Sequence, residues 1–244
     1  MTTGSRVLRR LAPFLGALLA CGCVSQPPTI AHVHVGHALT GAHDTPDRQG
    51  YFVLAEERAR AARMVAEERV RPGRSMDALQ LALEDLNRIV NEASRASLTG
   101  AVEEAVNHLQ FAAESDDASA NLRRSVPVFA RNSEGVLYRT SLVNLYVQDA
   151  LASRSREEME QLAEEVRRVV VAIEAGEDLD GNGFVGDTPR EFGLRQLRSE
   201  LEAMVGREEP PYATVDQWYL MNLVRMPSGD WIFRRGGSTS GANY

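Results

Sequence analysis

Amphipathic periodicity runs through most of this chain and limits the folds that it can adopt. In segment 79–93 the apolar residues form one continuous stripe at steps of three and four: Leu79, Ala82, Leu83, Leu86, Ile89, Val90 and Ala93. Similar stripes occupy segments 51–65, 102–113, 159–173 and 194–205. Because a helix places residues three and four apart on one face, each stripe predicts a helix that buries this face against a neighbour.

Breaks between the stripes indicate where the helices end. Pro72 and Gly73 should end the first helix, and Thr99 with Gly100 the second. From 118 to 152 the helical pattern continues, but its proline at 127 and glycine at 135 predict a kink or a break. We therefore expect an all-α fold, an antiparallel bundle of five to seven helices, in residues 51–235.

Two shorter segments flank the expected bundle. Residues 31–50 are expected to form an extended, histidine-containing strap across the helices. A short helix containing Trp218 and Val224 should precede a short apolar strand or strap within 226–233. Because both tryptophans lie in this C-terminal part, we expect it to dock on the bundle. The Gly- and Ser-rich residues 236–244 are expected to be disordered.

An acidic loop separates two of the predicted helices. Asp178, Asp180 and Asn182 alternate, so their side-chain oxygens can converge on one hard cation, and the Phe184 carbonyl can add a fourth oxygen. Gly183 lies where the backbone must turn sharply. This run resembles the first half of an EF-hand calcium loop, D-x-[DN]-x-[DN]-G, which implies that residues 178–189 bind calcium.

The second half of the loop departs from the EF-hand pattern. The twelfth position, where an EF-hand has a bidentate glutamate, is Pro189. Asp187 or Glu191 could close the site instead. However, Thr188, Pro189 and Glu191 are also typical of a helix start, so Glu191 could cap a helix rather than bind an ion. An Asx-rich turn without a metal is the alternative interpretation.

Four of the five histidines lie within twelve residues: His32, His34, His37 and His43. In an extended strap, His32 and His34 would share one face at a spacing that a divalent metal can use, and the other two could complete the site. His108 lies on a predicted helix. The pattern favours zinc, copper or haem binding as an alternative function. The competing interpretation is that the histidines pack and form hydrogen bonds within the strap.

Little in the sequence favours catalysis. The spacing of His32, His34 and His37 resembles the H-x-H-x-D-H of metallo-hydrolases, but Gly36 replaces the acidic residue and no strand-rich framework follows. Glu104 precedes His108 by one helical turn, which is a spacing for two metal ligands, yet no convincing nucleophile or general base accompanies them. The net charge of −7 argues against nucleic acid as a partner.

The N-terminus predicts export and a lipid anchor. Three arginines precede an apolar run at 11–20 that is too short to span a bilayer. The sequence Leu-Leu-Ala before Cys21 resembles the bacterial lipobox, which implies cleavage of a signal peptide, residues 1–20, lipid on Cys21, and a tether over 21–30. Cys23 is the alternative. Because Gly22 rather than aspartate follows, the resemblance implies attachment to the outer membrane, facing the periplasm.

Overall fold

The computed structural model describes residues 29–209, 212, 223–225 and 231–233, and the structural statements below concern these residues. Residues 29–212 contain seven α-helices and two 3-10 turns. They are α2 (Ile30–Leu39), η1 (Pro46–Arg48), α3 (Tyr51–Glu68), α4 (Met76–Asn91), α5 (Leu98–Glu114), α6 (Ala120–Ala152), α7 (Arg156–Ala175), η2 (Pro189–Glu191) and α8 (Leu194–Gly206). The predicted all-α bundle is confirmed.

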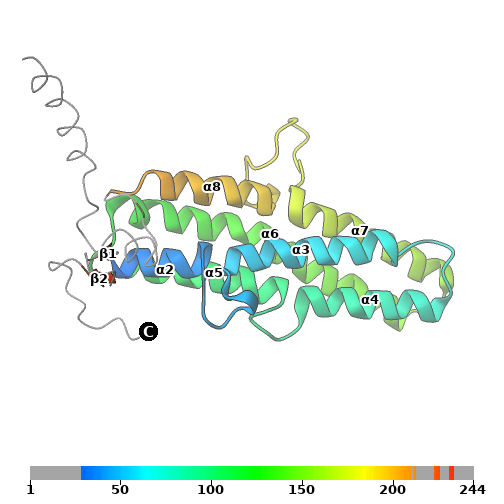
Figure 1. Ribbon diagram of the computed structural model, residues 1–244. Helices are drawn as coiled ribbons and strands as arrows, with labels where there is room; N and C mark the ends of the chain where they lie inside the picture. The colour runs from blue at the N-terminus through cyan, green and yellow to red at the C-terminus, as the bar shows by residue number, and fades with distance from the viewer. Residues whose placement is uncertain (1–28, 210–211, 213–222, 226–230, 234–244) are drawn as a thin grey trace, which may run out of the picture. The chain divides into compact units, whose positions relative to one another are not determined.

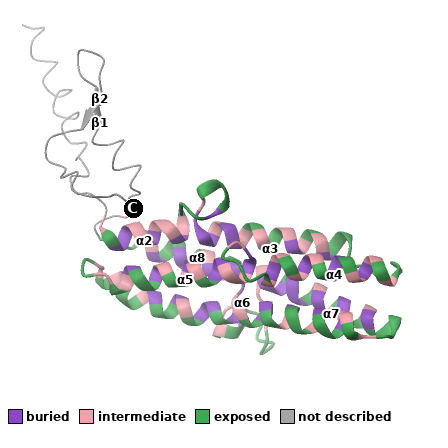
Figure 2. Ribbon diagram, turned by 90° about the horizontal axis from the view of Figure 1, so that it is seen from below, coloured by how far each residue is buried: buried purple, intermediate pink, exposed green. Residues whose placement is uncertain are grey.

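Helix α6 is the longest of the described helices and packs against four of the others. Its 33 residues correspond to a length of about 50 Å. Figure 1 shows α3, α4 and α7 toward one end of the bundle and α2, α5 and α8 toward the other, and α6 contacts α4, α5, α7 and α8. The buried faces of the helices point inward (Figure 2) and form one apolar core that includes Phe52, Leu86 and Phe129.

Of the kink or break predicted in the segment 118–152, the break is wrong, because α6 continues through both Pro127 and Gly135. Pro127 is exposed, so water can satisfy the carbonyl that loses its helical donor. Gly135 marks a close contact between elements. A Cβ atom there would lie 2.3 Å from the carbonyl oxygen of Pro189, so the absence of a side chain lets η2 pack directly against α6.

The expected extended strap is also wrong, because α2 is a helix. Its N-terminus is capped twice: the Thr29 hydroxyl accepts from the amide of His32, and the Asp117 carboxylate accepts from the amides of Ile30 and Ala31. Helix α2 packs against α5 and α3. Small apolar residues on its inner face, including Val35, permit this close packing.

Helix boundaries differ from the prediction in two further places. Helix α4 already ends at Asn91, and Thr99 and Gly100 lie in the first turn of α5. In the C-terminal segment, the strand β1 (Leu223–Arg225) pairs antiparallel with β2 (Trp231–Phe233). Val224 is therefore in a strand and not in the predicted helix, whereas β2 corresponds to the predicted apolar strand. Residues 1–28, Trp218 and 236–244 lie outside the described residues.

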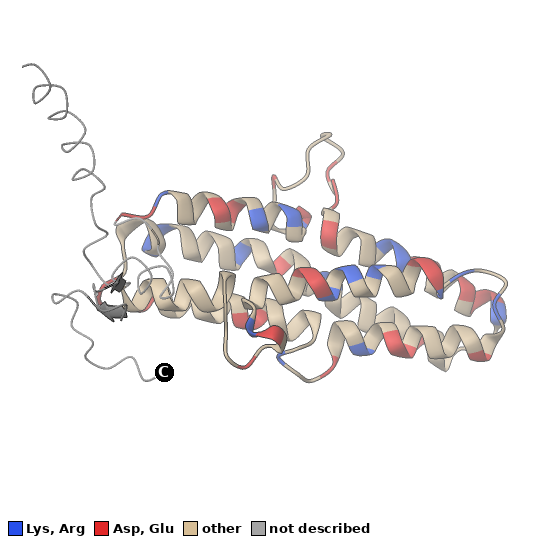
Figure 3. Cartoon of the chain, in the orientation of Figure 1, with Lys and Arg blue, Asp and Glu red and all other residues tan. Residues whose placement is uncertain are grey.

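Charged residues line the outer faces of α3, α7 and α8, whereas α2 carries none (Figure 3). Many form pairs one helical turn apart, such as Arg63 with Glu67 and Arg198 with Glu202, both at 2.7 Å. Exposed pairs of this kind contribute little to stability, so the core must supply most of it. Among the described helices, none combines the length and the apolarity needed to cross a bilayer.

Candidate functional site

The acidic loop leaves the bundle at the end of α7 and returns through η2 (Figure 1). Gly176 ends α7 with a φ of +76°, a backbone conformation that glycine adopts more readily than other residues. Gly183 has a φ of +88°, so the sharp turn expected there is present. Helix α8 begins only at Leu194, and the Thr188–Pro189 start signal belongs to η2, not to α8.

Backbone amides hold the Asp178 carboxylate inside the turn. One of its oxygens accepts from Gly181 at 2.8 Å and from Asn182 at 3.2 Å, and the other accepts from Gly183 at 2.8 Å. These bonds, the one from Gly183 most strongly, lower the pKa of Asp178. At neutral pH the Asp178 side chain is therefore an ionised carboxylate, held in place, whose oxygens could bind a cation.

Glu191 connects the two sides of the loop. Its side chain is fully buried, with Oε1 accepting from the amide of Leu179 at 3.3 Å. Oε2 accepts from Gly186 at 3.2 Å, Asp187 at 2.9 Å and Thr188 at 3.4 Å. Burial alone would raise the pKa of Glu191, but these four amides outweigh it and lower the pKa. The carboxylate thus carries out the predicted capping and also reaches back to the start of the loop.

Three of the four acidic residues among the predicted calcium ligands converge. One carboxylate oxygen each from Asp178, Asp180 and Glu191 lies within 4.8 Å of the other two. The Asn182 amide group donates to Asp180 at 3.0 Å and to Asp187 at 2.9 Å, so its nitrogen rather than its oxygen faces these acids. Asp187 does not belong to the convergent group. The side chain of Phe184 is exposed.

The five histidines divide into three environments, and the helical conformation of α2 explains the division. Residues two apart on a helix lie on nearly opposite faces, so His32 and His34 do not share a face as expected. His32 is buried, and its Nε2 lies 3.2 Å from the Glu208 carboxylate. His43 is exposed in the loop after α2.

The remaining three histidines, His34, His37 and His108, form a compact cluster between α2 and α5. One ring nitrogen of each lies within 4.8 Å of the other two. The Nδ1 atoms of His34 and His108 are 3.3 Å apart, and the ring centroids of His37 and His108 are 4.8 Å apart. Glu104, one turn before His108, pairs with Arg95 at 2.9 Å and lies outside the cluster.

Burial and mutual proximity favour neutral rings in this cluster. Burial, followed by the nearby His37 and His34, lowers the pKa of His108 to about 4. Burial also lowers the pKa values of His34 and His37. At neutral pH, each imidazole therefore keeps an unprotonated nitrogen with a lone pair.

Two aromatic neighbours of the cluster were missed by the sequence reasoning. The Tyr51 ring stacks on His108 with centroids 5.5 Å apart, and the Phe111 centroid is 5.6 Å from that of His34. Burial and the adjacent Asp44 carboxylate raise the pKa of Tyr51, so its hydroxyl stays protonated. Phe111 follows His108 by three residues on the same helix, and this spacing could have predicted that the two side chains are neighbours.

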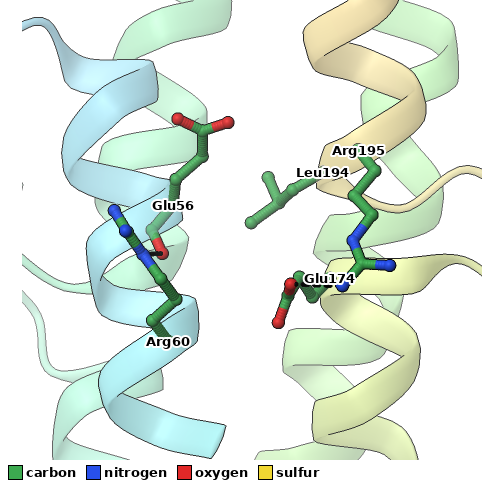
Figure 4. A pocket seen from close by; sticks show the side chains of 5 residues that line it. All are labelled: Glu56, Arg60, Glu174, Leu194 and Arg195. Carbon is green, nitrogen blue, oxygen red and sulfur yellow. Dashed lines mark hydrogen bonds and ion pairs between the residues drawn. The ribbon is translucent and has the colours of Figure 1, made fainter.

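A hollow of about 230 Å³ lies among α3, α7 and α8 (Figure 4). Glu56 and Arg60 line it from α3, and Glu174 and Arg195 face them. Glu174 pairs with Arg195 at 2.7 Å. The hollow is smaller than the usual ligand pocket of about 300–1,000 Å³ and much of its charge is paired, which favours a role in packing.

The predicted lipidation site, Cys21, lies outside the described residues. The two convergent clusters, in the acidic loop and between α2 and α5, are therefore the places where the described chain gathers metal-ligand chemistry. A scan against protein-family models and searches of curated proteins and solved structures found no match to this chain.

Proposed function

We propose that the protein is a calcium-binding lipoprotein of the cell envelope, with no catalytic role, whose acidic loop holds one calcium ion between α7 and η2. The observation that carries this proposal is the convergence of carboxylate oxygens from Asp178, Asp180 and Glu191 within 4.8 Å. Calcium lies about 2.3–2.6 Å from its oxygen ligands, so two ligands of one ion are at most about 5 Å apart. The three oxygens meet this limit.

Glu191 supplies the acidic ligand that Pro189 cannot. It lies two residues beyond the twelfth loop position, and the short turn η2 brings it back toward Asp178. Among the described residues, Oε1 of Glu191 accepts one amide, from Leu179, and this leaves it a lone pair for a cation. In this proposal Glu191 acts both as a cap of η2 and as a calcium ligand, so the two roles do not exclude each other.

Several carbonyl or water oxygens must complete the shell, because calcium takes six to eight oxygen ligands. The carbonyl of Phe184 is the ligand that the EF-hand resemblance implies. Rotation of the Asn182 side-chain amide would turn its oxygen toward the ion. The same rotation would break the hydrogen bond from Asn182 to Asp187, and the Asp187 carboxylate could then also turn toward the ion. With three protein carboxylates at its centre, the site selects a hard cation over a soft one.

The ion would act on the fold as a structural element. Asp178 follows the end of α7, and Glu191 closes η2, which packs directly on α6. Calcium bound to both would fix the path of the chain between α7 and α8. The envelope location rests on the lipobox-like sequence before Cys21 and on the tether that follows it.

Thermal unfolding tests this function. Calcium should raise the melting temperature of the full chain, because a ligand that binds only the folded state stabilises it by mass action. The double variant Asp178→Asn with Asp180→Asn should lose this rise and keep its helical content. Asp149→Asn, which removes an exposed carboxylate at the end of α6, is the control and should respond like the wild type. A calcium response that persists in the double variant would contradict the proposal.

A further inference from the structure

Three histidines from two helices meet where α2 packs against α5. His34 and His37 are three residues apart on α2, so they lie on one helical face, and His108 approaches them from α5. We propose that His34, His37 and His108 form a binding site for one divalent transition-metal ion of the zinc class. This site is separate from the acidic loop and does not depend on calcium binding there.

The distance between His34 and His108 fits this chemistry. In a tetrahedral zinc site with Zn–N bonds of about 2.0–2.1 Å, neighbouring nitrogen ligands are about 3.3–3.4 Å apart. The two Nδ1 atoms are 3.3 Å apart. The third nitrogen, from His37, lies within 4.8 Å of both. Binding of an ion would require a change of the His37 rotamer that brings this nitrogen closer.

The three rings have no other hydrogen-bonding role among the described residues. His34 and His108 are hydrogen-bonded only to each other, and His37 has no hydrogen-bond partner there. His32, one turn away on the other face of α2, shows the contrast, because it is committed to Glu208. Buried polar side chains such as His32 normally have a partner of this kind, whereas the half-buried rings of the cluster keep ring nitrogens available. Free imidazole nitrogens are ligands that zinc, copper and nickel prefer.

The surroundings of the cluster orient the rings and favour a cation. Tyr51 stacks on His108, and Phe111 lies against His34 and His108, which restricts rotation of these imidazoles. The carboxylate of Asp117 favours positive charge at His34, and that of Asp44 favours it at His37. Three histidine ligands also leave the fourth tetrahedral position for water or a small exogenous ligand.

Cobalt(II) is the probe for this site, because four-coordinate cobalt absorbs visible light much more strongly than hexa-aqua cobalt. The sample is the full chain with Cys21→Ser and Cys23→Ser, which removes both thiols, purified without a histidine tag or chelator. Cobalt titration should give an intense visible spectrum that saturates at one ion per chain. Zinc should then abolish this spectrum by displacement.

Single histidine variants decide which residues bind the ion. His34→Asn, His37→Asn and His108→Asn should each weaken cobalt binding by about 100-fold or more, since even the loss of a residue behind a ligand costs 10–100-fold. His43→Asn, which changes the exposed histidine nearby, is the matched control and should bind within about 3-fold of the wild type. The Asp178→Asn, Asp180→Asn double variant should also keep the cobalt spectrum.

Two checks separate loss of ligands from loss of folding. Each histidine variant should keep the helical circular dichroism and the calcium response of the parent protein. His37→Asn is the most informative variant, because His37 has no hydrogen-bond partner to lose among the described residues. The proposal is overturned if the parent protein gives no saturable four-coordinate spectrum, or if folded His37→Asn binds cobalt like the parent.

Discussion

The buried Glu208 carboxylate lies 3.2 Å from Nε2 of His32, although 176 positions separate the two residues. Ser119 also donates to this carboxylate, at 2.8 Å, and so does the Asn121 amide. The Glu208 carboxylate therefore connects α2, the start of α6 and the end of α8. Because this carboxylate is buried, the fold is stable only if its hydrogen bonds are complete.

Removing His32 should therefore destabilise the bundle. His32→Ala leaves Glu208 with one partner fewer in a buried site, and we expect the free energy of unfolding to fall by about 1–3 kcal/mol. His43→Ala, at an exposed position, should change it by less than about 0.5 kcal/mol. Urea unfolding measures both variants. Equal effects would show that the His32–Glu208 contact does not stabilise the fold.

Gly135 should be intolerant of any side chain. A Cβ atom there would lie 2.3 Å from the Pro189 carbonyl oxygen and 3.1 Å from that of Phe192. Gly135→Ala must push η2 away from α6, and we expect a loss of about 1–3 kcal/mol in urea unfolding.

The control for this variant is Gly206→Ala, in the last turn of α8, where an added Cβ would meet no atom within 4 Å. We expect this change to be neutral or to stabilise the protein by up to about 1 kcal/mol. If Gly135→Ala were equally harmless, the close packing of η2 on α6 would be wrong.

Glu174 should make stability depend on pH in the acidic range. Arg195, and then Arg63, lower the pKa of this carboxyl below its ordinary value of 4.5. Its stabilising contribution is fully present above this ordinary value, and it is lost as the pH falls through the lowered pKa of the folded state. The stability difference between the wild type and Glu174→Gln should therefore shrink as the pH falls from about 5 to 3.

Urea unfolding at a series of pH values gives this difference directly. Glu134→Gln, which changes an exposed carboxylate on α6, serves as the control and should show a smaller difference at every pH. A difference between the wild type and Glu174→Gln that stays constant across the range would rule out the contribution of the Arg195 and Arg63 pairs.

Cys21 should determine membrane attachment. If it carries lipid, Cys21→Ser should move the protein from the membrane fraction to the soluble fraction of a bacterial host, because acyl chains supply the membrane affinity. Cys23→Ser should leave it with the membrane. Fractionation with labelled fatty acid measures attachment and lipidation together. The opposite pattern would assign the lipid to Cys23.

The helical stripes were sufficient to predict the bundle, because residues such as Leu83 and Leu86 recur at a spacing that only a helix places on one face. The same reasoning failed at Gly135. The local sequence around a glycine in a helical pattern looks the same whether the glycine breaks the helix or lets another segment of backbone pack closely against it. The neighbour here is Pro189, which is 54 residues away, and no local pattern reveals it.

The error at α2 had a similar cause. Alternation of valine and histidine matches the period of a strand, whereas the helix is supported by the Thr29 cap and by Asp117, 87 residues after Ile30. In the helix, His34 and His37 lie on one face, and His32 lies on another. The sequence-based grouping of the histidines was therefore incorrect, because the grouping depends on the local conformation.

In the acidic loop, local spacing identified Asp178 and Asp180 but left the closing residue open between Asp187 and Glu191. The turn η2 favours Glu191, whose buried carboxylate lies beside the first two acids.

Calcium binding to the acidic loop is measured most directly by isothermal titration calorimetry on the full chain with Cys21→Ser. We expect one calcium ion per chain for the parent and no detectable binding for the Asp178→Asn, Asp180→Asn double variant, with Asp149→Asn unchanged. Absence of calcium binding to the folded parent protein, or binding that is unchanged in the double variant, would contradict the proposed function.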